Sequence, residues 1–350
     1  MFNPLNLLRF NKGNIMYTIA TTPALPKIEI YQVRMLTNTI KNYNQSIINY
    51  DPIIFNKIKR ISNQASHLNE LVRNSLPIMK LKTRYIINST MYDSFTFSEE
   101  NHYQKSLDEL ETIEFIDDLS DLKDEIIKLK TPLRTTIDFL SALELDEINQ
   151  LKYHYYTKKK AALLNSIENN KKKIEEFNRD LNTIIKAEEV ILNYRLSDMF
   201  DKFFPEISLI ESMDIPPSKK DLIKAAIDCA KRLLVIIDNG LDFMRLVDTR
   251  LYLADQLFVL REQAREYAES DNKLSYLLTL ASEVTKIEKN KNSITESFQQ
   301  LQNYLQQWID YINHCLNKET MDIHRTIKSC NTFMDFILET EYQYQRQLAD

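Results

Sequence analysis

Histidines and cysteines, the residues that most often bind metals, gather in only one stretch of this sequence. That stretch holds His314, Cys315, His324 and Cys330. Adjacent residues on a helix point about 100° apart, so one metal ion could hardly bind both His314 and Cys315. We therefore expect no metal site. Together with Cys229, the two cysteines form an odd and widely spaced set, which favours free buried thiols over a disulfide framework.

The sequence motifs of catalysis are absent. Its two glycines, Gly13 and Gly240, lie far apart, whereas phosphate-binding and dinucleotide-binding loops need several glycines close together. The zinc-protease, nucleophile-elbow and EF-hand patterns do not occur either. We expect a protein that is not an enzyme and needs no cofactor.

Two basic runs, residues 158–160 and 171–173, lie near several tyrosines and could in principle contact nucleic acid. Acidic residues interleave with them, which is typical of a solvated helix face. The net charge of −5 at pH 7 provides no general attraction for nucleic acid or anionic lipid. We expect no nucleic-acid partner.

The segment between two predicted long helices is unusually apolar. A turn region should be polar, and burying each large apolar side chain stabilises by about 1.5–3 kcal/mol, so something must cover them. The cover could be the chain itself, a bilayer or a partner protein. The predicted tip residues are Phe200, Phe203, Phe204, Ile207, Leu209, Ile210, Met213 and Ile215.

The helix predicted after Pro216-Pro217 has a narrow charged stripe on an otherwise apolar cylinder. Intrahelical pairs of Lys224 with Asp228, and of Asp228 with Arg232, are expected from the spacing. A helix of this pattern could be a bundle helix whose stripe faces water, or it could meet lipid with its apolar arc while the stripe lines a pore. The stripe includes Lys224, Asp228, Lys231, Asp238 and Asp242, and the apolar arc includes Leu222, Leu233, Ile237, Phe243 and Met244.

The scarcity of glycine also predicts the fold class. The favoured hairpin turns of β-sheets need residues at positive φ, so a chain with two glycines is expected to be all-α. No strong helix breaker lies between about residues 131 and 199, a length of about 100 Å as a helix, and a returning helix of about 80 Å is expected over residues 218–270. The sequence predicts an elongated helical bundle with a long antiparallel coiled-coil stalk that ends in a hydrophobic hairpin tip. Turns are expected near residues 117–121 and 270–272, and a cap or kink at Thr131-Pro132.

We interpret the chain as a single elongated domain, residues 1–350, with four parts. An N-terminal arm covers residues 1–26, and a tail bundle combines residues 27–130 with 271–350. The stalk covers residues 131–270, and its tip lies at about residues 193–240. The N-terminal segment lacks the features of a Sec-type signal peptide. No run of 18 or more uncharged apolar residues exists, so any membrane insertion would have to be conditional and shared among subunits.

Taken whole, the sequence resembles the B component of the xenorhabdolysin-type binary cytotoxins, which are α-helical pore-forming toxins related in architecture to cytolysin A. The resemblance covers the full length. It rests on the glycine-poor helical composition, on the long mid-chain hairpin and on the segment MFDKFFPEISLIESMDIPPSKKDLIKAAIDCAKRLLVIIDNG at the end of that hairpin.

The resemblance implies a function. Two components would assemble on a target-cell lipid membrane into a hetero-oligomeric ring, so the partner would be a second (A) component. Residues 200–215 would enter the membrane, the apolar arc would face lipid or a neighbouring protomer, and the charged stripe would line the pore. The protein would be secreted without a classical signal peptide and would then act at the host cell membrane as a haemolysin.

A second interpretation needs no membrane. The same pattern is compatible with a non-enzymatic coiled-coil scaffold or tether that docks helices of another protein through its apolar tip. Liposome binding and permeabilisation in the presence of a partner distinguish the two.

Overall fold

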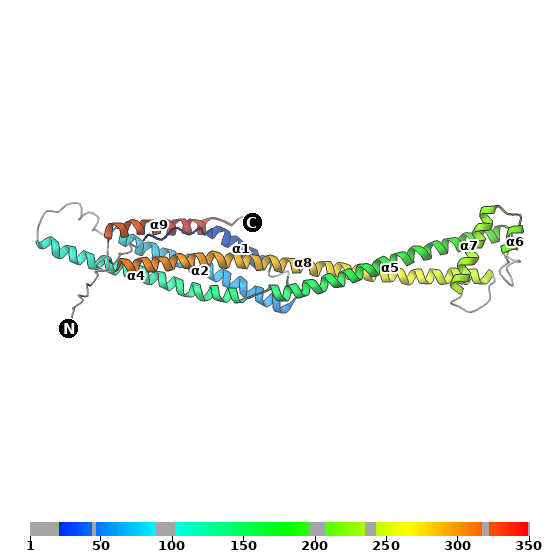
Figure 1. The fold of residues 1–350 in the computed structure, drawn as a ribbon, viewed down its shortest axis with the longest axis horizontal. Coiled ribbons are helices and arrows are strands. Elements are labelled where there is room, and N and C mark those ends of the chain that lie inside the picture. Colours follow the sequence, from blue (N-terminus) through cyan, green and yellow to red (C-terminus); the bar gives the residue numbers. More distant parts are fainter. Residues whose placement is uncertain are drawn as a thin grey trace, which may run out of the picture. The chain divides into compact units, whose positions relative to one another are not determined.

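The computed structural model describes residues 21–43, 47–88, 102–196, 207–234, 243–316 and 322–348 (Figure 1). The chain divides into two units: unit 1 comprises residues 1–149 and 282–350, and unit 2 comprises residues 150–281. Within the described ranges every regular element is a helix and none is a strand. The all-α prediction is therefore confirmed.

Unit 1 is a helical bundle. It contains α1 (Ile30–Tyr43), α2 (Pro52–Ile87), α4 (His102–Ala142), α9 (Ile323–Gln345) and the C-terminal part of α8 (Phe243–Cys315). Helix α2 packs on α4 and α9, and α1 packs on α2 and α9. The largest fully buried side chains are Trp308, Phe115, Phe298 and Phe333. Trp308 and Phe333 lie with ring centroids 4.7 Å apart, which ties α8 to α9.

Helix α2 begins where the sequence predicts. The side chain of Asp51 accepts hydrogen bonds from the backbone nitrogens of Ile53 (2.7 Å) and Ile54 (2.9 Å), and Pro52 occupies the first turn. A proline in this position costs no hydrogen bond, because the first backbone N–H groups of a helix have no intrahelical partner.

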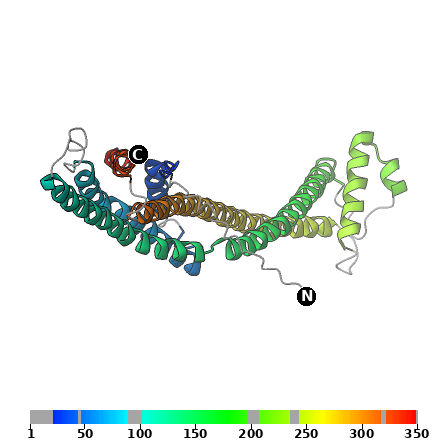
Figure 2. The ribbon, with the colours of Figure 1, turned by 60° about the vertical axis from the view of Figure 1, so that its left-hand side comes forward.

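Unit 2 contains most of α5 (Asp146–Asn193), α6 (Ile207–Ser212), α7 (Pro217–Leu234) and the N-terminal part of α8. Within this unit α5 and α8 run antiparallel. Lys160 lies 3.6 Å from Asp271, Asn170 Nδ2 donates to the carbonyl of Leu260 (3.2 Å), and the Glu188 carboxylate lies 3.5 Å from Arg250. Figure 2 shows α6 beside α7, and the two helices are in contact.

The two predicted turns are wrong, because residues 117–121 lie inside α4 and residues 270–272 lie inside α8. Pro132 also lies inside α4, so it does not cap the start of a helix, and the kink stays a prediction. Leu119 and Leu122 are buried, so packing carries α4 through its acidic stretch. A break that the sequence does not signal occurs instead at residues 143–145, between α4 and α5. The predicted helix over residues 218–270 corresponds to α7 and the first part of α8, and residues 235–242 lie outside the described residues.

Helix α5 ends at Asn193 rather than near residue 199. Its C-terminus is capped by a residue in the left-handed region of backbone conformation. Arg195 has φ 55°. The backbone nitrogen of Leu196 donates to the carbonyl of Ile191 (2.9 Å), and that of Arg195 donates to the carbonyl of Leu192 (3.1 Å). This is the bonding of a helix C-terminus that usually carries glycine.

Candidate functional site

Unit 2 has an apolar core in which α5, α6, α7 and α8 meet. The alternation of apolar residues at every third and fourth position of α7 places one face of that helix in the core. Residues 187, 226 and 230 are alanines, and such small side chains allow helices to approach closely. The core consists of Ile184, Ala187, Val190, Ile191, Ile210, Ile215, Ile223, Ala226, Ile227, Cys229, Ala230, Leu233, Leu246 and Leu253.

The predicted tip residues do not share one environment. Ile210 is buried, Ile215 is 8% exposed and Met213 packs partly against the core. Ile207 and Leu209 point outward, with 50% and 44% of their surface exposed. Phe200, Phe203 and Phe204 lie outside the described residues. Part of the described tip is therefore buried in the core, and part faces solvent.

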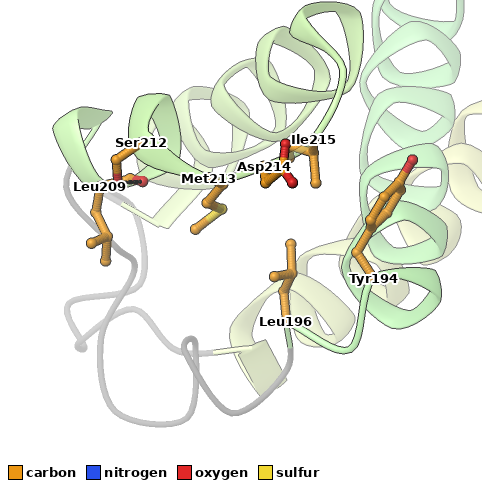
Figure 3. A pocket seen from close by; sticks show the side chains of 7 residues that line it. All are labelled: Tyr194, Leu196, Leu209, Ser212, Met213, Asp214 and Ile215. Atoms are coloured by element: carbon orange, nitrogen blue, oxygen red, sulfur yellow. Dashed lines mark hydrogen bonds between the residues drawn. The ribbon is translucent and has the colours of Figure 1, made fainter.

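A pocket of about 400 Å³ lies between the end of α5 and the segment after α6 (Figure 3). Leu196 and Met213 point into the same space, one from each side. Four of its seven described lining residues, Leu196, Leu209, Met213 and Ile215, are apolar, so the pocket offers room for apolar groups. It is lined by Tyr194, Leu196, Leu209, Ser212, Met213, Asp214 and Ile215.

The described part of the predicted apolar arc, Leu222 and Leu233 on α7, is covered by the chain itself. Leu233 is buried, and Leu222 packs on the edge of the core. Ile237 lies outside the described residues. Phe243 and Met244 belong to the first turn of α8, where the structure describes the backbone only.

Two charged side chains of α7, Lys224 and Arg232, pair with other elements and not with Asp228 as predicted. Lys224 pairs with Glu211 at the end of α6, and this contact lowers the pKa of the Glu211 carboxyl. Arg232 donates to the Asp180 carboxylate on α5 at 2.7 Å. Asp228 and Lys231 are exposed. Asp238 and Asp242 lie outside the described residues.

Sequence reasoning missed an ion pair in unit 2 between a buried carboxylate and a half-exposed arginine. Glu188 is only 7% exposed, and its Oε2 lies 3.5 Å from Arg250 on α8. Its Oε1 accepts no hydrogen bond from the described residues. Burial raises the pKa of the Glu188 carboxyl, and the charge of Arg250 opposes the rise. The sequence spacing does indicate that Glu188 is buried, because it falls four residues after Ile184 and three before Ile191, on the core face of α5.

The His/Cys stretch contains two buried thiols. Cys315 and Cys330 are buried, as is Cys229. Burial raises the pKa of Cys229 to about 11 and that of Cys330 to about 12, so these thiols stay protonated at neutral pH. In the described part of the chain no three His, Cys, Asp or Glu side chains gather as metal ligands would. The described helices likewise include none with the length and hydropathy needed to cross a bilayer.

The structure resembles solved structures over nearly its whole length. PaxB from Photorhabdus luminescens matches with a TM-score of 0.80 and 21% identity, covering 93% of this chain and 100% of that one. A chain of the XaxAB pore complex from Xenorhabdus nematophila matches with a TM-score of 0.69 and 20% identity, covering 91% and 99%. YaxB from Yersinia enterocolitica matches with a TM-score of 0.57 and 14% identity, covering 92% and 100%.

Comparison of the sequence alone gives no such match. No family model matches it, and no curated protein matches it. The likeness therefore lies in the arrangement of the helices. The resemblance read from the sequence is confirmed for the fold: this chain has the fold of PaxB and of its counterpart in the XaxAB pore complex.

Proposed function

We propose that this protein is a subunit of a two-component pore-forming cytotoxin. It leaves its producer as a water-soluble chain, meets a second component on a target-cell membrane and forms a lytic, hetero-oligomeric pore with it. The observation that carries this proposal is the fold shared over more than nine tenths of the chain with a component of a pore complex. The activity proposed for this chain involves no catalysis.

The chemistry of unit 2 supports a role for the tip and α7 in insertion. The apolar arc of α7 is covered in the isolated chain by α5 and by the segment after α6, and it needs another apolar environment whenever α7 leaves that core. Lipid or a neighbouring protomer would supply this environment. Lys224, Asp228 and Lys231 would then face an aqueous lumen, because a charged side chain in hydrocarbon is costly.

Insertion would begin at the exposed part of the tip. Ile207 and Leu209 already face solvent, so they can contact a membrane without prior opening of the core. Lys224 is held to Glu211 next to them, and that pair would have to separate before α7 could move away from α6. The organisation into arm, tail bundle, stalk and tip is part of the same proposal.

The function is tested by dye release from liposomes. We expect release when this chain and the second component are added together, and little release with either alone. A scaffold or tether would permeabilise no vesicle in any combination, and that result would refute the proposal.

The tip assignment is tested by Ile207→Asp combined with Leu209→Asp. Each charge costs about 2.5–3.5 kcal/mol at the centre of a bilayer, so release should fall by more than about a hundredfold, while the exposed positions leave the helical circular dichroism signal unchanged. The matched control is Leu338→Asp, at an exposed leucine of α9 in unit 1, which should release dye like the parent chain. Equal release by the double variant and the parent would show that the tip is elsewhere.

A further inference from the structure

The joint between α4 and α5, residues 143–145, breaks a stretch whose sequence favours a continuous helix. Its residues are Leu143, Glu144 and Leu145, and neither proline nor glycine occurs among them or beside them. Leucine and glutamate are among the better helix formers. The helix nevertheless ends at Ala142 and a new one begins at Asp146. Something outside the joint must hold the break.

Side chains of α2 and α8 hold a backbone atom of each joint residue. Lys291 Nζ donates to the carbonyl of Leu143 at 2.8 Å, and Lys57 Nζ donates to that of Glu144 at 2.7 Å. The backbone nitrogen of Leu145 donates to the Glu288 carboxylate at 3.3 Å. We call Lys57, Glu288 and Lys291 the clamp.

Each clamp bond uses a group that a continuous helix would use for itself. With hydrogen bonds between residues four apart, the carbonyls of residues 143 and 144 would accept from the nitrogens of residues 147 and 148, and the nitrogen of Leu145 would donate to the carbonyl of Ser141. Clamp and continuous helix therefore compete for the same three atoms. Loss of one arrangement leaves the atoms free for the other.

Glu288 and Lys291 can break their bonds to the joint and still remain paired with each other. Glu288 and Lys291 are 6% and 2% exposed, and Lys291 Nζ lies 2.7 Å from Glu288 Oε1. An unpaired charge in such a place is strongly destabilising, but these two remain paired with each other on α8 after they let go of the joint.

The joint lies close to the end of unit 1. Just beyond it, Asn149 is buried and bonded to Tyr50 (2.9 Å) and Thr285 (3.0 Å), and α5 continues into unit 2 from residue 150. Straightening of the joint would therefore change the direction in which α5 continues.

We propose that the joint is a conformational switch of assembly: the clamp holds the break in the unassembled chain, and during pore formation the three bonds exchange and α4 and α5 become one helix. This inference rests on the proposed function, since it names the step that the assembly would trigger. The clamp residues control the step and contact neither lipid nor lumen in this account.

The inference is tested by spin labels at Thr135→Cys and Glu147→Cys, two exposed positions of unit 1 on either side of the joint. The native cysteines are buried and leave these two as the reactive thiols. In a continuous helix the two backbone positions would lie about 18 Å apart along the axis. We expect the pulsed-EPR distance of the unassembled parent chain to differ from this helical value and the membrane-assembled chain to adopt it. An unchanged distance after assembly would overturn the inference.

A variant of the clamp gives a readout that needs no pore. Glu288→Gln with Lys291→Met should move the distance of the unassembled chain towards the helical value. The matched control is Glu125→Gln with Lys128→Met, an ion pair of the same spacing on the surface of α4, which should keep the parent distance. Identical distances in the clamp variant and the parent would contradict the switch even if dye release succeeds, and a shift would support it even if release fails.

The variant Glu144→Gly covers the case in which the clamp variant does not fold. Glu144 is exposed and contributes only its carbonyl to the clamp, so the break remains held. The equilibrium constant for the continuous helix is about fivefold lower with glycine than with alanine at this position. We expect slower dye release with unchanged thermal unfolding. Release as fast as that of Glu144→Ala would count against helix fusion.

Discussion

At the scale of single residues, unit 2 contains a carboxylate whose surroundings favour its protonated form. Glu188 shares the core face of α5 with Ile184 and Ile191, and its ionic partner Arg250 lies 3.5 Å away, a distance longer than a normal hydrogen bond. Because burial disfavours the charged form, the folded chain binds this proton more tightly than the unfolded chain does. The free energy of unfolding therefore gains a contribution from Glu188 as the pH falls through the raised pKa, and loses it as the pH rises.

The first prediction concerns this pH dependence. As the pH falls from about 7 to about 4.5, the free energy of unfolding of the parent chain should gain the contribution of Glu188, and that of Glu188→Gln should not. Urea unfolding at several pH values measures both. Glu189→Gln, the adjacent exposed glutamate, is the control and should behave like the parent. A Glu188→Gln chain with the parent's pH profile would mean that Glu188 titrates normally.

Arg195 is a second residue whose local conformation costs stability. It adopts φ 55° at the end of α5, where a side chain with a Cβ atom is strained by about 1–2 kcal/mol. Glycine would adopt this φ without strain, but the two glycines of the chain are at positions 13 and 240.

The second prediction is that Arg195→Gly raises the free energy of unfolding by about 1 kcal/mol. Arg195→Ala keeps the strain and should change it little, so the comparison removes any effect of the lost charge. Urea unfolding followed by circular dichroism measures both. Equal stability of the two variants would show that the strain is relieved in some other way.

At the scale of elements, α7 is the helix whose environment must change most in our account. The described apolar face of α7, which includes Ile223, Ile227 and Leu233, lies in the unit 2 core, and an ion pair between Arg232 and Asp180 links the helix to α5. Such surface pairs contribute only about 0–1 kcal/mol, so they guide the packing of α7 without preventing its release.

The third prediction is that a covalent link between α5 and α7 blocks pore formation. Asp180→Cys and Arg232→Cys, joined by a short reductant-cleavable crosslinker, should abolish dye release, and reductant should restore it. The control joins α5 to α8 through Lys160→Cys and Ser275→Cys, whose parent side chains lie 2.6 Å apart, and should leave release intact. Full release by the crosslinked α5–α7 chain would mean that α7 stays in place.

Elements also show what the sequence can and cannot predict. The start of α2 at Asp51-Pro52 and the buried side of α7 are local patterns, and both are read correctly from spacing and caps. The break at residues 143–145 cannot be predicted locally, because the residues that hold it are more than eighty positions away in the sequence. The partner of Lys224 was missed for a related reason: Glu211 belongs to another helix, and intrahelical spacing points to Asp228 instead.

At the scale of the whole molecule, composition was the most informative property. Scarcity of glycine alone predicts the all-α class, and the structure has the fold of PaxB with only 21% identity. A fold that depends on the 3.6-residue periodicity of long helices tolerates such divergence, because many apolar side chains satisfy each core position. The roles of individual residues in a pore depend on a partner and a membrane, and the isolated chain does not reveal them.

The central claim is that the exposed part of α6 enters the hydrocarbon of a membrane when the second component is present. An environment-sensitive fluorophore (NBD) on Leu209→Cys tests it directly, since the native thiols are buried and Leu209 is exposed. We predict a blue shift and a strong rise in emission when vesicles and the second component are both added, and neither when one is omitted. The same label on Leu338→Cys should stay in water throughout. Emission at position 209 that remains aqueous while the vesicles leak would contradict the account.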